Sequence, residues 1–130
     1  MISLRFIITI HFSLSFLSGL RDDYLMKYYL YVIELDKKVW ESAKFRKKNP
    51  NSRAGGRCFY VGQSARAPML RLKQHKEGYK SNSFARRFGI KLVPEFYEKY
   101  NPIPTRKDAE ELEEYLANKL KKERYGVWFN

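Results

Sequence analysis

Cysteine and histidine are scarce in this sequence of 130 residues. Cys58 is the only cysteine, and His11 and His75 are the only histidines. A disulfide within one chain is therefore excluded, and so is a structural zinc site of cysteine and histidine, because such a site uses four of these ligands. Cys58 lies in the run RCFYV, and we interpret it as a small buried strand residue rather than a reactive thiol.

Long hydrophobic runs are missing as well. The most apolar segment extends from Phe6 to Leu20 and is interrupted by His11 and several serines. It is shorter than the ~20 apolar residues that a membrane-spanning helix needs. We therefore expect no stable membrane span, and we expect the protein to be cytoplasmic.

Residues 1–25 form an apolar N-terminal extension with three open interpretations. Met26 offers an alternative start, which would make the upstream stretch a start-site artefact. The extension also has the outline of a signal-like or membrane-surface segment, although its charged start is thin and no small-residue cleavage site follows Leu20. A third interpretation is an extra helix packed on the domain. We place the domain at residues 26–130.

Acidic residues are few relative to basic ones. The sequence has 26 Lys and Arg against 14 Asp and Glu, a formal net charge of +12. The charges of residues 1–25 cancel, so the whole excess belongs to the domain. An excess of this size is typical of proteins that bind polyanions, nucleic acid above all. A generically basic surface, as on ribosome-associated proteins, is the alternative that charge alone leaves open.

Internal repeats and low-complexity tracts are absent, and the length suits one domain. Two segments rich in β-branched and aromatic residues, 28–35 and 57–63, predict strands. The connection between them is long and predicted to be partly helical. A third strand with a following loop is expected within residues 90–100, where Pro94 favours an edge position.

Three helices follow from local signals. Pro68 at a first turn and Gly78 just past the end mark a short helix, on which Arg71 and His75 share a face. Residues 82–88 predict another short helix. The clearest helix covers residues 105–120, because Thr105 offers a cap before a periodic apolar run.

Glu113 is the acidic residue of the last helix that points inward. At ~100° per residue, Ala109, Leu112 and Leu116 define a buried stripe, and Glu113 falls at its edge. A carboxylate there requires a partner, because burying an unpaired charge is costly. Arg71, a bound Mg²⁺ or both would provide one, and an ion pair without chemistry is the simpler alternative. Glu123 is a second inward candidate.

Two tyrosines are predicted to meet on the sheet. Tyr31 and Ile33 share one face of the first strand, and Tyr60 and Gly62 share one face of the second. If the strands pair, both phenols converge on one side. Tyrosine is common in strands, so ordinary packing explains either one alone.

The order of the candidate residues along the chain resembles that of the GIY-YIG nuclease superfamily. The residues are Tyr31, Tyr60, Arg71, His75 and Glu113. In that family a Gly-Ile-Tyr-like strand and a Tyr-Ile-Gly-like strand precede a helix with arginine and a helix with a metal-binding glutamate. The resemblance covers roughly residues 27–130. It departs from the family in Tyr29, which replaces the first glycine, and in an insertion at residues 39–56.

The resemblance implies a site and a chemistry. Glu113 would hold one Mg²⁺ or Mn²⁺, Arg71 would stabilise charge on the phosphate, and Tyr31 would be the general base. Tyr60 would orient water or phosphate, and His75 could share in the proton transfer, so the division among these three stays open. A C-terminal asparagine near the site is frequent in the family, and Asn130 is its candidate here.

The expected substrate is nucleic acid, with DNA preferred over RNA, and its contacts are expected from basic residues outside the site. Such residues mostly bind phosphates. The candidates are Lys44, Arg46, Lys47, Lys48, Arg57, Arg66, Lys73, Arg86 and Arg87. A homodimer or a protein partner would supply specificity.

The sequence thus predicts an α+β fold, a small three-stranded antiparallel sheet flanked by helices, that acts as an endonuclease. The first alternative is a nucleic-acid-binding module that has the same fold and no turnover. The second is a structural protein of a ribosome or membrane surface.

Overall fold

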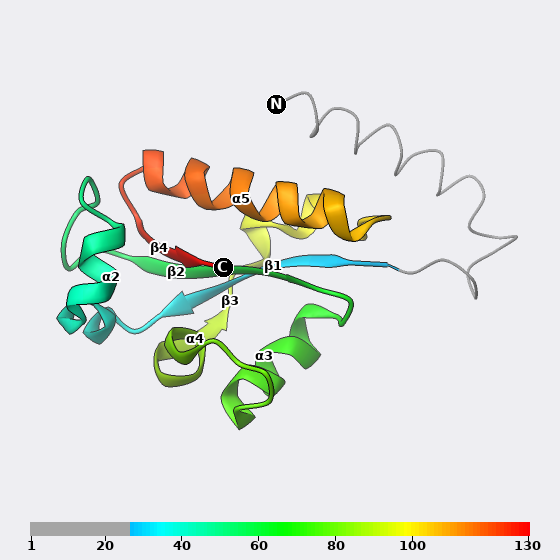
Figure 1. The fold of residues 1–130 in the computed structure, drawn as a ribbon, viewed down its shortest axis with the longest axis horizontal. Coiled ribbons are helices and arrows are strands. Elements are labelled where there is room, and N and C mark those ends of the chain that lie inside the picture. Colours follow the sequence, from blue (N-terminus) through cyan, green and yellow to red (C-terminus); the bar gives the residue numbers. More distant parts are fainter. Residues whose placement is uncertain (1–26) are drawn as a thin grey trace, which may run out of the picture.

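The fold is a four-stranded sheet with helices on both faces, in a computed structural model that describes residues 27–130 (Figure 1). The strands are β1 (Tyr29–Leu35), β2 (Cys58–Ser64), β3 (Gly89–Leu92) and β4 (Gly126–Phe129), in the order β3-β1-β2-β4. The interpretations of residues 1–25 lie outside the described residues. Within residues 27–130, no helix is both long and apolar enough to cross a membrane.

The α+β class is confirmed, but the three-stranded antiparallel sheet is corrected to a mixed sheet of four strands. β1 pairs antiparallel with β2 and β3, and β4 pairs parallel with β2. β4 was missed because it is only four residues long and directly follows a helix. β3 is shorter than the expected 90–100 segment, since Pro94 begins a 3-10 turn, Pro94–Phe96, that ends the strand.

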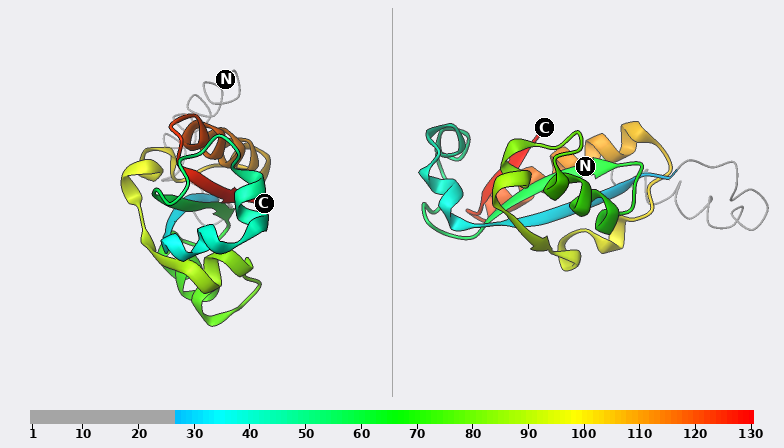
Figure 2. Two further views of the ribbon diagram at one scale, coloured as in Figure 1. Left: turned by 90° about the vertical axis from the view of Figure 1, so that its left-hand side faces the viewer. Right: turned by 90° about the horizontal axis from the view of Figure 1, so that it is seen from below.

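The two helical layers lie on opposite faces of the sheet. The long helix α5 (Arg106–Lys122) covers one face, and α3 (Pro68–Glu77) and α4 (Ser83–Phe88) cover the other (Figures 1 and 2). Thr105 caps α5 by accepting a hydrogen bond from the backbone N–H of Asp108, as its sequence predicts. The apolar stripe of α5 is buried, so its inward-facing positions are fixed by the sheet.

The insertion between β1 and β2 forms a 3-10 helix (Lys37–Glu41) and the short helix α2 (Ala43–Lys48). It packs beside β4 through Asn49, whose buried amide donates to the carbonyls of Phe45 and Val127 and accepts from the Val127 N–H. The Ser52 hydroxyl donates to the carbonyl of Tyr125, the residue that precedes β4. The insertion therefore covers the free edge of β4, which would otherwise expose unpaired backbone groups.

Candidate active site

A cavity opens where β4 stops short of its neighbour. β4 pairs with β2 only as far as Val61, whereas β2 runs on to Ser64 beside β1. The cavity, of about 330 Å³, lies at this notch and joins the two faces of the sheet. Its lining residues are Tyr31, Tyr60, Gln63, Arg71, Glu110, Glu113, Glu114, Phe129 and Asn130. We call it the tyrosine cavity.

Tyr31 and Tyr60 meet on the sheet face that α3 covers, as the alternation of the strands predicts. Tyr31 lies opposite Gly62, and Ile33 lies opposite Tyr60. The two phenol rings are 6.1 Å apart between centroids, and both are almost fully buried. A Cβ at Gly62 would come within 2.5 Å of the Tyr31 hydroxyl oxygen. Glycine is needed at this position because the Tyr31 side chain lies directly across it.

His75 reaches both tyrosines from α3. Its ring lies 5.8 Å from that of Tyr31 and 5.3 Å from that of Tyr60, and its Nε2 is 2.7 Å from the Tyr31 hydroxyl oxygen. The backbone N–H of Asn82 donates to His75 Nδ1 at 3.3 Å. An accepting Nδ1 carries no hydrogen, so in the neutral ring the hydrogen is on Nε2. His75 is then a donor to the Tyr31 oxygen.

Burial sets the protonation of these three groups. It lowers the pKa of His75 to about 4, with the Arg71 charge adding to the effect, so the imidazole is neutral at neutral pH. Burial also raises the pKa of Tyr60 to about 12 and that of Tyr31 further, the latter with help from Tyr60. Both phenols are therefore protonated in the protein alone.

Glu113 enters the cavity from the opposite layer. Its side chain is buried on α5, with 8% of the residue exposed, so the inward phase read from the sequence is confirmed. Burial raises its pKa to about 8 and the nearby Glu110 contributes, while a hydrogen bond from the Gln63 backbone N–H opposes the shift. Glu123, the second inward candidate, is exposed at the C-terminal cap of α5 and was wrongly placed.

Arg71 lines the cavity, but its guanidinium is held by the chain that follows α3. It donates to the carbonyls of Tyr79 and Lys80 at 3.1 and 2.6 Å, and to the Gln74 side chain. The ion pairs of residues 27–130 do not join it to Glu113, so this expected partnership is corrected. These carbonyls hold the cation at the cavity without neutralising its charge.

Asn130, the candidate for the family's C-terminal asparagine, lines the tyrosine cavity. Its side-chain NH₂ donates to the Tyr60 hydroxyl oxygen at 3.0 Å. Its side-chain oxygen accepts from Asn82 at 3.4 Å. β4 places Asn130 near Tyr60, because Phe129, the last paired residue of β4, lies opposite Val61, which follows Tyr60 in β2.

Asn82 is the residue that the sequence did not reveal. Besides donating to His75 and to Asn130, it caps α4 through its side-chain oxygen, which accepts from the N–H groups of Phe84 and Ala85. In the sequence it reads only as a helix cap. Its second role depends on α4 beginning beside α3, which no local pattern indicates.

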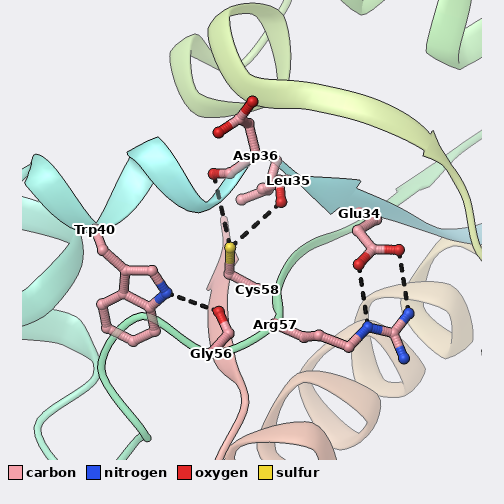
Figure 3. A network of polar contacts seen from close by, with 7 residues as sticks. All are labelled: Glu34, Leu35, Asp36, Trp40, Gly56, Arg57 and Cys58. Atoms are coloured by element: carbon pink, nitrogen blue, oxygen red, sulfur yellow. Dashed lines mark hydrogen bonds and ion pairs between the residues drawn. The ribbon is translucent and has the colours of Figure 1, made fainter.

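Not all of the basic residues predicted to bind nucleic acid are available for it. Arg57 donates two hydrogen bonds to the Glu34 carboxylate, at 3.0 and 3.1 Å, and lowers the pKa of that carboxyl (Figure 3). Arg46 donates to the Trp40 carbonyl at 2.6 Å. The other candidates, Lys73 included, are exposed. Lys44 and Lys48 lie over the ring of Trp128, at 5.3 and 6.0 Å.

Comparison with known proteins identifies one family. The family model of the GIY-YIG catalytic domain matches residues 27–126, which is most of the chain. No curated protein and no solved structure matches it. The matched region contains Tyr31, Tyr60, Arg71, His75 and Glu113, but it ends four residues before Asn130.

Proposed function

We propose that this chain, which belongs to the GIY-YIG catalytic domain family, is a metal-dependent endonuclease that hydrolyses phosphodiester bonds in DNA. Membership of the family implies a nuclease-type function on nucleic acid. The observation that carries the finer proposal is the tyrosine cavity, where a buried acid, a buried phenol pair and a guanidinium from separate elements meet.

The donors of the cavity fit a single hard cation. Glu113 is its one buried carboxylate, and a raised pKa means that proton and metal compete for the same oxygens. Mg²⁺ is commonly held by one or two carboxylates with water and substrate phosphate completing its shell. A Mg²⁺ or Mn²⁺ on Glu113 would supply a Lewis acid for the phosphate and help to ionise a nearby phenol or water.

Tyr31 is our choice for the general base, with His75 as its hydrogen-bond donor. The Nε2–H of His75 points at the Tyr31 oxygen, and a donor at that distance stabilises a phenolate. His75 itself cannot accept the proton of Tyr31 at Nε2, because that nitrogen already carries one. Tyr60, which accepts from Asn130, would orient water or the phosphate.

Arg71 would stabilise the charge that develops on the phosphate. Its guanidinium is anchored by backbone carbonyls while Arg71 lines the cavity, so it has little freedom to lose on binding a phosphate. Planar donors of this kind suit two phosphate oxygens.

The test is cleavage of plasmid, branched DNA and RNA with Mg²⁺ or Mn²⁺. We expect nicks that disappear when EDTA is added. We expect Glu113→Ala and Arg71→Ala each to reduce the cleavage rate by about a hundredfold or more. Glu123→Ala is the control, because Glu123 is an exposed glutamate at the C-terminal cap of the same helix. Wild-type turnover in Glu113→Ala would rule out the metal role. Binding without cleavage under all conditions would favour the inactive binding module.

A further inference from the structure

A second cavity lies outside the tyrosine cavity, between the insertion and the end of α5. It has a volume of about 810 Å³, and we call it the basic cavity. Four of its lining residues are cationic, Lys48, Lys121, Lys122 and Arg124, and the others are polar residues and a proline. None of its lining residues is acidic, so the side chains present do not balance this charge. Such a surface attracts a polyanion.

A third cavity, of about 280 Å³, joins the first two. It shares Lys48, Asn118 and Lys121 with the basic cavity, and Glu114, Phe129 and Asn130 with the tyrosine cavity. We call it the connecting cavity. The three together follow α5 and β4 away from the site. Glu114 is the one acid that lines the connecting cavity, and it stands at the end beside the tyrosine cavity.

The path follows one face of α5. Successive lining residues of α5 are separated by four, three and one positions, a spacing that keeps them on one side of the helix. These residues are Glu114, Asn118, Lys121 and Lys122. At ~1.5 Å per residue, the stretch from Glu114 to Lys122 covers about 12 Å. One strand of a duplex advances about 3.4 Å per nucleotide, so this length suits about three to four nucleotides.

Aromatic rings lie against two of the cations that line the path, Lys48 and Lys121. Lys44 and Lys48 lie over the ring of Trp128, and Lys121 lies over that of Phe129 at 5.6 Å. The ammonium of Lys121 also donates to the Lys48 carbonyl at 3.1 Å. Because the rings face ammonium groups, they orient cations rather than offering free faces for stacked bases. The path is therefore suited to the phosphate backbone and not to the bases.

We propose that the connecting and basic cavities bind the sugar-phosphate backbone of the nucleic acid on one side of the cleaved bond, with Lys48, Lys121, Lys122 and Arg124 as phosphate ligands. This inference rests on the proposed function for its orientation, since it takes the tyrosine cavity as the place of cleavage. The insertion thereby becomes one wall of the substrate path.

The experiment measures binding separately from cleavage. Dissociation constants are measured by fluorescence anisotropy, in EDTA, for labelled duplex and single-stranded oligonucleotides at several salt concentrations. The test variant is Lys122→Ala with Arg124→Ala, because both side chains are exposed and neither makes a hydrogen bond within residues 27–130. The control is Lys107→Ala with Lys119→Ala, which removes the same charge from exposed positions on α5 that line none of the three cavities.

We expect weaker binding of the test variant at low salt and a smaller salt dependence. The loss of two phosphate contacts reduces the slope of log Kd against log salt by about 1.8. Raising the salt from about 50 to 200 mM should therefore weaken binding by about tenfold less in the test variant than in the wild type. The control retains the wild-type slope. Equal slopes in test and control variants would overturn the inference even if cleavage were observed.

The outcomes keep this inference distinct from the proposed function. A reduced slope in a protein that never cleaves would support the backbone path and contradict the nuclease. Vesicles of anionic phosphatidylserine form a second arm of the experiment. If the test variant lost vesicle binding but kept nucleic-acid binding unchanged, the basic cavity would be a lipid headgroup site and the inference would be wrong. Melting temperatures within a few degrees of the wild type show that both variants fold.

Discussion

At the scale of single residues, the site combines groups whose charges the fold suppresses. His75 is neutral, both phenols are protonated, and the pKa of Glu113 is raised to about 8. Each shift has burial as its largest cause. In the proposed mechanism, a cation that reached Glu113 would restore the carboxylate and favour a nearby phenolate.

Glu113 gives a prediction about stability and pH. Its pKa rises from an ordinary value of 4.5 in the unfolded chain to about 8 in the fold. Between these values the unfolded chain loses the proton and the fold keeps it, so stability falls as pH rises. Relative to Glu113→Gln, we expect the wild type to lose on the order of 5 kcal/mol across this window.

Urea unfolding without divalent ions at a series of pH values measures the difference between wild type and Glu113→Gln. Glu123→Gln is the matched control, since this residue is exposed. Millimolar Mg²⁺ should recover stability in the wild type alone. A difference that does not change with pH would contradict the buried, protonated acid.

The protonation of His75 is a separate prediction. With the Asn82 N–H on Nδ1 and a pKa of about 4, the hydrogen should stay on Nε2 at every pH above about 5. Imidazole ¹⁵N chemical shifts measure this directly. Observation of the Nδ1–H form, or titration near the usual value of 6.5, would remove His75 as the donor to Tyr31.

Gly62→Ala tests the close approach of Tyr31. The new Cβ would clash with the Tyr31 hydroxyl, so we expect a loss of about 1–3 kcal/mol in stability and a loss of cleavage larger than the stability loss explains. Gly126→Ala is the control, because its Cβ would meet the Trp40 ring at 2.5 Å as well, yet away from the tyrosines. Equal activity of the two variants, measured well below their melting temperatures, would argue against a role for the Tyr31 position.

At the scale of elements, β4 and the insertion depend on each other. β4 is short and lies at the edge of the sheet, and the Asn49 amide imitates a neighbouring strand by bonding both backbone groups of Val127. The same contact places the walls of the basic cavity, since residues 48–52 line it from one side and α5 from the other.

Asn49→Ala should therefore destabilise the protein by about 2–4 kcal/mol, because it removes three buried hydrogen bonds and leaves the Val127 N–H without its partner. Asn51→Ala, two residues away and exposed, should change stability by less than about 0.5 kcal/mol. Urea unfolding compares the two. Similar small effects would show that the insertion is not anchored through Asn49.

At the scale of the whole molecule, the net charge of +12 predicts binding that depends strongly on salt. If at least four phosphates are neutralised, Kd for nucleic acid should rise about a hundredfold between about 50 and 200 mM salt. Titration of the wild type with a labelled duplex measures the slope. A flat dependence would contradict backbone binding and favour a basic surface with another purpose.

The interfaces between elements also explain what the sequence could predict. Local signals identified β1, β2, α3, α4 and α5, because caps, periodicity and β-branched runs act within each segment. They missed β4, which is stabilised by its pairing with β2 and by Asn49 and not by its own four residues. They gave no indication that Asn82 contacts His75. They left Arg71 open as a partner of Glu113, and backbone carbonyls hold Arg71 instead.

The sequence by itself determined the family, the helical phase that turns Glu113 inward and the strand alternation that brings Tyr31 and Tyr60 to one face. These follow from periodicities of 3.6 and 2, which are properties of a single segment. Only the tertiary structure decided where the cavity opens, how Asn82 orients His75 and which cations form a continuous path. Those depend on contacts between residues far apart in the chain, and no local pattern carries their distances.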